Sequence, residues 1–288
     1  MAVFLQSLLS GILMGGVYAL IGIGLTLIFG VMRIINFAHG ELLMLGMYAT
    51  WLLHQLWGVD PYLSVLAVAP LLFLWGALLQ RVFIARVMDA PPQNQILLTI
   101  GLGLVMSNAV MLGAGPGYKL LTTPYSSASF KLAGLSVSQP LLYAFLITLA
   151  VTGSLYAFLL RTDTGLAIRA AAQDRDAAQL MGVDVRRTSL LAFGIGAALA
   201  GVAGALVAPT YYIYPQVGGA FTLKAFVIVV LGGMGSVMGA TLGGVLIGVT
   251  ESLAAVYVAS GLKELVVYVL FLALLLFRPA GLLGKSRA

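Results

Sequence analysis

The sequence predicts an all-α membrane protein: a single domain, residues 1–288, in which about eight transmembrane helices form a polytopic bundle with one charged cytoplasmic loop. Two observations carry this prediction. Hydrophobic residues make up 61% of the chain and charged residues 8%, whereas a soluble domain is roughly a quarter charged. Uncharged runs also recur along the whole chain, most of them long enough to cross a membrane as one helix. This pattern excludes soluble enzymes and nucleic-acid-binding proteins.

The uncharged segments follow one another as in a multi-pass membrane protein. In order, they cover residues 3–32, 34–58 (interrupted by Glu41), 62–80, 95–115, 139–160, 189–214, 225–250 and 265–277. The first would be ~45 Å long as one helix, so we expect it to tilt or break. The seventh contains a short apolar piece, a glycine-rich turn with Gly233 and Gly235, and a better span at 237–259. A half-helix before a full helix would put this turn at membrane depth beside a transport path.

The loop at residues 161–189 is the most basic connector and sets the expected orientation. It carries Arg161, Arg169, Arg175, Arg186 and Arg187. Such loops stay in the cytoplasm, which places the N-terminus outside. If 225–250 crosses once, there are eight crossings and the basic tail, with Lys285 and Arg287, is outside. If it crosses twice, there are nine and the tail is cytoplasmic. Segment length favours eight and charge favours nine, so both stay open.

Two short helices are expected within this loop. Asp174 is a candidate N-cap of the second, and Gly182 stands where a left-handed C-cap is favoured. Asp176, Ala177 and Ala178 give that helix a compact face of small residues, which fits a cleft on another protein. The spacing resembles the cytoplasmic coupling motif of ABC-importer permeases, Glu-Ala-Ala followed three residues later by Gly, with Asp in place of Glu.

Small residues recur four positions apart, as at Gly11 and Gly15 and at Gly239 and Gly243. This spacing lets helix backbones approach closely. It indicates either plain close packing or helices that slide against one another.

Longer strings extend the likeness along the chain. Residues 15–20 read Gly-Gly-Val-Tyr-Ala-Leu, residues 24–30 read Gly-Leu-Thr-Leu-Ile-Phe-Gly, and residues 36–41 read Asn-Phe-Ala-His-Gly-Glu. Gly-Gly-Met-Gly-Ser at 232–236 and Arg-Pro-Ala-Gly-Leu-Leu-Gly at 278–284 complete the pattern. Together these strings resemble the permease family for branched-chain amino acids, the LivH type, over essentially the whole chain.

The resemblance implies the permease subunit of an ATP-driven ABC importer for leucine, isoleucine, valine or related amino acids, in the bacterial inner membrane. The implied partners are a second homologous permease, two cytoplasmic ATPases and an extracytoplasmic substrate-binding protein. ATP and Mg²⁺ would bind the ATPases, which would push on the helix at Asp176, Ala177, Ala178 and Gly182. The chain itself would hold no cofactor and catalyse no reaction. Its Gly-Lys-Ser at 284–286 does not form a phosphate-binding loop, because Pro279 stands where that motif needs glycine.

Polar residues in or near the spans are the candidates for the translocation path. Glu41 could bind the ammonium group of an amino acid, and Asn36 or backbone N–H groups its carboxylate, with His39 nearby. The alternative is a satisfied turn at the membrane boundary, in which Asn36 caps a helix, His39 bonds a carbonyl and Glu41 pairs with Arg33. Glu251 is either a gating or pairing acid inside a span or an ordinary loop charge.

Other functions stay open at this point. Permeases related to this family also serve urea or short amides. A self-contained channel or secondary transporter would carry protons through Glu41 or Glu251, but no ion-site pattern surrounds these two carboxylates. A membrane enzyme is least favoured, because the sequence offers no nucleophile–base pair or metal-ligand constellation.

Overall fold

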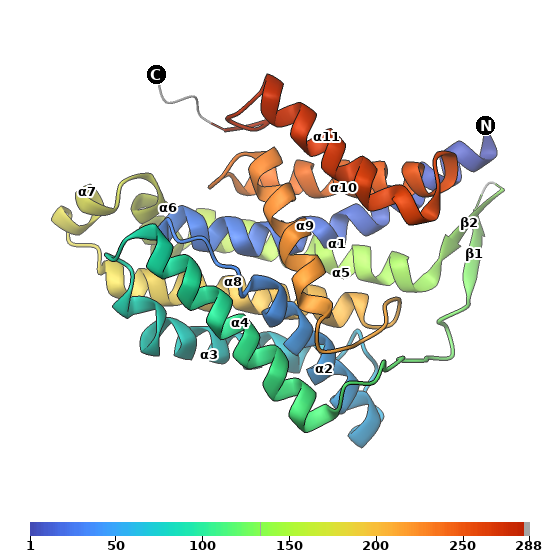
Figure 1. Cartoon of the computed structure of the whole chain (residues 1–288), viewed down its shortest axis with the longest axis horizontal. Coiled ribbons are helices and arrows are strands. Elements are labelled where there is room, and N and C mark those ends of the chain that lie inside the picture. Colours follow the sequence, from blue (N-terminus) through green and yellow to red (C-terminus); the bar gives the residue numbers. More distant parts are fainter. Residues whose placement is uncertain (133, 285–288) are drawn as a thin grey trace.

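A computed structural model describes residues 1–132 and 134–284 and shows a helical bundle with two distinct ends (Figure 1). The short helices α6 (Asp163–Gln173) and α7 (Arg175–Leu180) form one end, called here the α6–α7 end. The N-terminus and an antiparallel hairpin of β1 (Ser129–Leu132) and β2 (Leu135–Ser138) form the other, called the hairpin end. Lys285 and Arg287 of the basic C-terminal tail lie outside the described residues.

Seven described helices are long and apolar enough to cross a membrane. They are α1 (Ala2–Met32), α3 (Val65–Val82, continued by the 3₁₀ turn Ile84–Arg86), α4 (Pro92–Ala114), α5 (Gln139–Arg161), α8 (Val185–Val207), α10 (Val237–Tyr257) and α11 (Lys263–Phe277, preceded by the 3₁₀ turn Ser260–Leu262). Two further helices complete the bundle: the shorter apolar α9 (Val217–Gly232) and α2 (His39–Trp57), whose first turn carries His39 and Glu41. The predicted fold class is therefore confirmed.

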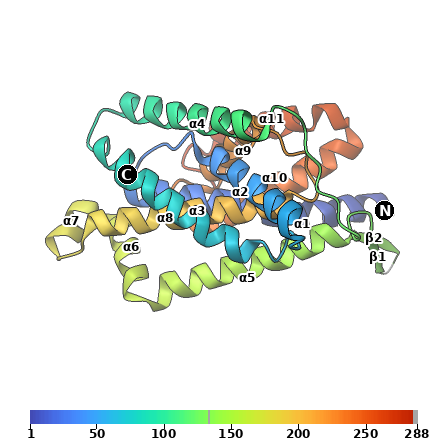
Figure 2. The same cartoon turned by 90° about the horizontal axis from the view of Figure 1, so that it is seen from below.

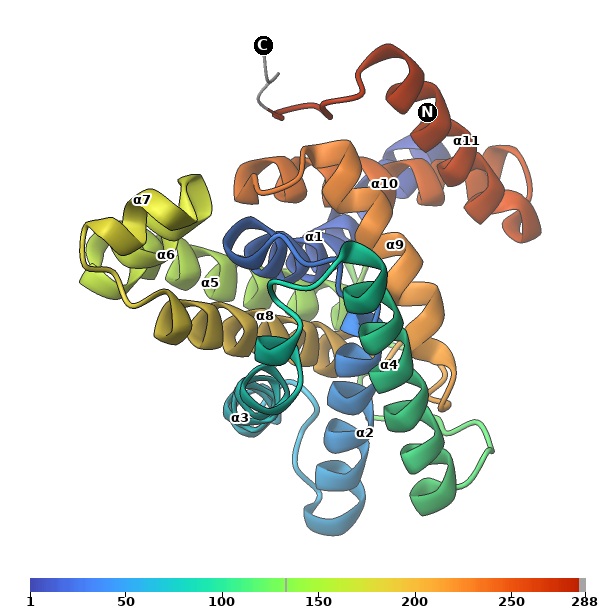
Figure 3. The ribbon, with the colours of Figure 1, turned by 60° about the vertical axis from the view of Figure 1, so that its left-hand side comes forward.

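Helix α1 lies at the centre of the bundle, between α10 and α8 (Figure 3). Gly11 and Gly15 face α10, where any side chain on them would collide with the backbone at Val249 and Val245. Lipid tails are as apolar as the helix surfaces, so the hydrophobic effect does not drive two apolar helices together in a membrane. Van der Waals contact between closely approaching backbones holds them together instead. Helices α4 and α5 lie on opposite outer sides of the bundle and are far less buried than α1 (Figure 2).

The segment around Gly232 differs from the expected half-helix. Helix α9 begins at Val217 and crosses the bundle steeply, from the side of α2 to the side of α10, and α10 then runs along α1 toward the hairpin end (Figure 1). The span that begins at Val237 is confirmed. The prediction of a short piece starting at residue 225 is wrong, because the charge of Lys224 made the first half of α9 resemble a loop. Lys224 is instead buried within α9.

The turn between α9 and α10 consequently lies at the α6–α7 end and not at membrane depth. Gly235 contacts Gly30, near the end of α1. Gly233 has a φ of 101° and lies against the C-terminal segment, whose Leu282 and Leu283 N–H groups donate to the last carbonyls of α9 at 2.8 and 3.1 Å. Helix α9, with 16 residues, is shorter than the seven candidate spans, so eight and nine crossings both stay predictions.

Candidate functional site

The first candidate site is a break in the helices after α1. The chain leaves α1 at Met32, runs back into the bundle without helical structure, and starts α2 at His39. The His39 ring donates from Nε2 to the Ile21 carbonyl over 3.0 Å. Because Ile21 lies about three turns before the end of α1, α2 begins deep in the bundle and not at the membrane boundary. Irregular backbone at this depth requires partners within the protein.

Neighbouring helices supply those partners. The Phe37 N–H donates to Thr99 Oγ1 of α4 at 3.2 Å, and the Gly40 N–H donates to Thr222 Oγ1 of α9 at 3.0 Å. Asn36 Oδ1 accepts the Ala38 N–H at 3.1 Å, which forms a turn before the helix and is not a helix cap. A residue larger than glycine at position 40 would overlap the α9 backbone. The break is therefore held between α4 and α9.

Glu41 lies in the first turn of α2, beside Gly103 of α4 and Gly218 of α9. Its Oε2 is buried without a hydrogen-bond partner, as are Asn36 Nδ2 and His39 Nδ1. Among the described residues, no ion pair joins Glu41 to Arg33. The alternative prediction was a turn whose polar side chains all have partners. Its contact between His39 and a carbonyl is confirmed, and its ion pair between Glu41 and Arg33 is wrong. A contact with substrate stays a prediction for Asn36, His39 and Glu41.

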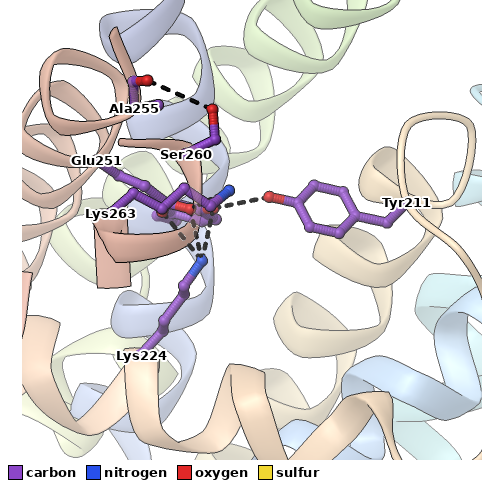
Figure 4. Close-up of polar contacts among 7 residues, drawn as sticks. Tyr211, Lys224, Glu251, Ala255, Ser260 and Lys263 are labelled. Carbon is purple, nitrogen blue, oxygen red and sulfur yellow. Dashed lines mark hydrogen bonds and ion pairs between the residues drawn. The ribbon is translucent and has the colours of Figure 1, made fainter. Parts of the chain in front are cut away.

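The second candidate site is a buried cluster of charges around Glu251 (Figure 4). The loop interpretation of Glu251 is wrong, because this residue lies in α10 and is 6% exposed. Lys224 Nζ donates to its two carboxylate oxygens at 3.1 and 3.0 Å, and Lys263 Nζ lies 2.9 Å from Oε1. Lys224 also donates to the Tyr18 hydroxyl at 3.0 Å, which in turn lies 2.9 Å from the Tyr211 hydroxyl.

Sequence reasoning missed both lysines of this cluster. The signal was present, because a lone Lys224 and a lone Glu251 of opposite sign each interrupt an apolar stretch. Charges inside a membrane protein usually pair with one another. The cluster contains residues of α1, α9, α10 and α11, so its contacts link these four helices.

The third candidate site is the α6–α7 end. The two expected short helices are confirmed: the Asp174 carboxylate accepts the N–H groups of Asp176 and Ala177 at 3.0 Å, and Gly182 has a φ of 88°. Asp176, Ala177 and Gly182 are exposed, whereas Ala178 is buried.

Two large apolar residues at this end were not predicted as functional. Leu180 and Met181 are 88% and 84% exposed. A cavity of about 400 Å³ lies at the same end of the molecule, lined in part by Gln80, Gln179 and Arg186. Leu180 and Met181 are adjacent in the chain and therefore form a small exposed apolar surface at this end.

Comparison with known proteins agrees with the geometry. Residues 7–275 match the family described as branched-chain amino acid transport system / permease component. The chain is 35% identical, over 98% of its length and 96% of the relative, to the high-affinity branched-chain amino acid transport system permease protein BraD of Pseudomonas aeruginosa. It is 34% identical to LivH of Salmonella typhimurium over the same shares and 27% identical to LivM of Escherichia coli over 94% of this chain and 68% of the relative. No solved structure matches. The chain thus belongs to the family of branched-chain amino acid transport permeases.

Proposed function

We propose that the chain imports leucine, isoleucine, valine or related amino acids as one permease of an ATP-driven transporter in the bacterial inner membrane. The observation that carries the proposal is the near full-length similarity to permeases named for branched-chain amino acid transport. The expected partners are a second homologous permease, two ATPases that bind ATP and Mg²⁺, and an extracytoplasmic binding protein. The similarity to both LivH and LivM supports a pair of related permeases.

The orientation follows from the basic residues. Arg33, Arg81 and Arg86 follow or end helices that reach the α6–α7 end, where the basic loop also lies. Lys119 and Lys131 belong to the connection between α4 and α5 at the hairpin end. Because basic connections stay inside, we place the α6–α7 end in the cytoplasm and the hairpin end outside.

The α6–α7 end is the proposed contact with an ATPase. Asp176, Ala177 and Gly182 frame the exposed surface, and the side chains of Leu180 and Met181 project from it. ATP binding can drive the permease only if this contact differs between the outward-facing and inward-facing states. Burying two apolar side chains in one state more than in the other supplies such a difference.

The break before α2 is the proposed substrate contact along the path. Glu41 has a carboxylate oxygen without a partner and Asn36 has an amide nitrogen without a partner. An amino acid carries an ammonium group that a carboxylate binds and a carboxylate that an amide N–H or a helix N-terminus binds. Gly233, Gly235 and Glu251 have structural contacts that hold helices together, so we assign them a supporting role.

The test begins with the chain purified from its native membrane in mild detergent. Mass spectrometry should identify a second permease and ATPase subunits in fixed ratio. The assembled transporter, in vesicles with ATP inside and its binding protein outside, should accumulate labelled leucine. Accumulation of urea or a short amide in place of leucine would change the substrate class. Proton-driven uptake by the chain alone would instead support a secondary transporter.

A further inference from the structure

A cavity of about 230 Å³ lies at the hairpin end, and none of the residues of the break before α2 lines it. Its wall consists of the tyrosines after α8, the first turns of α9 and the start of α11. The lining residues are Tyr211, Tyr212, Tyr214, Val217, Ala220, Phe221, Lys224 and Glu264. Drug-sized ligands occupy pockets of about 300–1,000 Å³, so this cavity suits a smaller molecule.

The cavity combines one cation, one anion and an apolar wall. Lys224 lines it and is nearly fully buried, whereas Glu264 is exposed at its rim. Val217, Ala220 and Phe221 contribute the apolar surface along one side of α9. A molecule complementary to this wall carries a carboxylate, an ammonium group and an apolar side chain.

The charge cluster lets Lys224 accept a second anion. Glu251 lies between Lys224 and Lys263 and is bonded to both (Figure 4). If Lys224 turns one N–H toward an arriving carboxylate, Glu251 keeps its contact with Lys263 at 2.9 Å and is not left as an unpaired buried charge. In a single Lys–Glu pair, no second lysine would remain to neutralise the glutamate.

We propose that this cavity is an outer binding site for an apolar amino acid. The amino acid occupies this site before it reaches the break at α2. Lys224 binds the carboxylate, Glu264 binds the ammonium group, and Val217, Ala220 and Phe221 contact the side chain. The identity of the ligand as a transported amino acid rests on the proposed function, whereas the site itself rests on the cavity and its charges.

The experiment measures equilibrium binding of labelled L-leucine to the assembled transporter in lipid nanodiscs, without the binding protein. Ala220→Trp fills the cavity and should abolish binding. Glu264→Gln should weaken it about tenfold, because a charge-assisted hydrogen bond to the ammonium group is lost. Glu264→Asp should retain part of the affinity. Leu276→Trp, on an exposed position of α11 far from the cavity, is the matched control and should bind as the unaltered protein does.

Competition with two analogues reads the polar contacts directly. Leucinol lacks the carboxylate and 4-methylpentanoate lacks the ammonium group, so both should compete weakly with leucine. In the Glu264→Gln variant, removal of the ammonium group should matter less than in the unaltered protein. Equal competition by all three molecules would overturn the assignment of Lys224 and Glu264.

Two outcomes would overturn the site while leaving the proposed function intact. One is leucine uptake and binding unchanged in Ala220→Trp and Glu264→Gln. The other is native mass spectrometry in which Ala220→Trp displaces a phospholipid and leucine binding is unaffected, since an amino-containing headgroup shares part of this chemistry. Failure of the proposed function has a different signature: the unaltered assembled transporter would not import leucine at all.

Discussion

Two buried glutamates of this protein differ in whether their charge has a partner. Glu251 contacts two lysines, whereas Glu41 has a carboxylate oxygen with no partner in the described chain. A buried charge that is paired recovers part of its desolvation cost from the partner, whereas an unpaired one recovers none and destabilises the fold. The two glutamates should therefore respond in opposite ways to neutralisation.

For Glu41→Gln, we expect unchanged or higher thermal stability and a large loss of leucine uptake. The neutral amide removes the cost of an unpaired charge and cannot bind an ammonium group as a carboxylate does. Melting of the detergent-purified transporter and uptake into vesicles, measured side by side, test this prediction. Normal uptake by the variant would remove Glu41 from the path.

For Lys224→Met, we expect a loss of stability of about 2 kcal/mol, because Glu251 loses one charge-assisted contact inside the bundle and keeps the contact with Lys263. The double variant Lys224→Met/Glu251→Leu should recover part of that loss. Thermal melting tests both, with Lys131→Met on the exposed hairpin as the control. Equal melting temperatures for Lys224→Met and the control would show that the cluster contributes nothing to stability.

At the scale of elements, glycine is required where two helices touch or where a turn reverses the chain. Helix α1 has both kinds of neighbour: α10 along its length, and the Gly235 turn near its end. Close packing, one of the two interpretations of the small-residue spacing, accounts for the contacts of Gly11 and Gly15.

Gly15→Leu should separate α1 from α10 and destabilise the bundle by at least about 2 kcal/mol. Gly153→Leu in α5 is the matched control, because nothing lies within 4 Å of the position that its side chain would start from. Comparison of the two melting temperatures tests the prediction. A control variant as unstable as Gly15→Leu would show that any leucine at a helix glycine is harmful here.

Gly182→Pro should abolish coupling between ATP hydrolysis and uptake while the bundle still folds. Proline fixes φ near about −65°, whereas Gly182 has a φ of 88° and donates its N–H to Gln179. Gly182→Asn should keep coupling, because asparagine tolerates the left-handed conformation. Hydrolysis and uptake are measured on the same vesicles. Full uptake by Gly182→Pro would remove the turn from the coupling mechanism.

A bulky residue at Ala178, another of the residues named for the coupling helix, is a poor test of coupling. Ala178 is buried inside this chain, so enlarging it would disturb α7 itself. Leu180→Ser/Met181→Ser is the better choice, because both side chains are exposed. We expect this variant to fold normally. Less of the ATPase subunit should co-purify with it than with the unaltered chain.

At the scale of the whole molecule, the order of helices fixes which loops share a side. The turn at Met234 lies at the α6–α7 end and the connection at Ser260 lies between α10 and α11 at the hairpin end. In the eight-crossing alternative, Met234 would lie within the membrane and Ser260 in the cytoplasm.

Single-cysteine labelling distinguishes these topologies, since the natural chain has no cysteine. On intact spheroplasts, an impermeant maleimide should label Ser260→Cys, and it should label Met234→Cys only after the membrane is opened. Labelling of Ser260→Cys only in opened membranes would support eight crossings.

The sequence alone determines the class of the protein, because long uncharged runs in a chain with 61% hydrophobic and 8% charged residues satisfy their backbone in lipid as helices. It also determines the α6–α7 connection, whose caps at Asp174 and Gly182 are local in the chain. Local conformational preferences and sequence motifs are enough to predict the helical class and these caps.

Only the tertiary structure decides where charge and irregular backbone lie. Lys224 meets Glu251 across 27 positions of sequence, and the break at Asn36 is held by Thr99 and Thr222 from other helices. The same residues would fit a loop, which is why α9 was expected to start after Lys224. A charge is tolerable inside a membrane only if a distant partner neutralises it, and packing, not local sequence, brings that partner into contact.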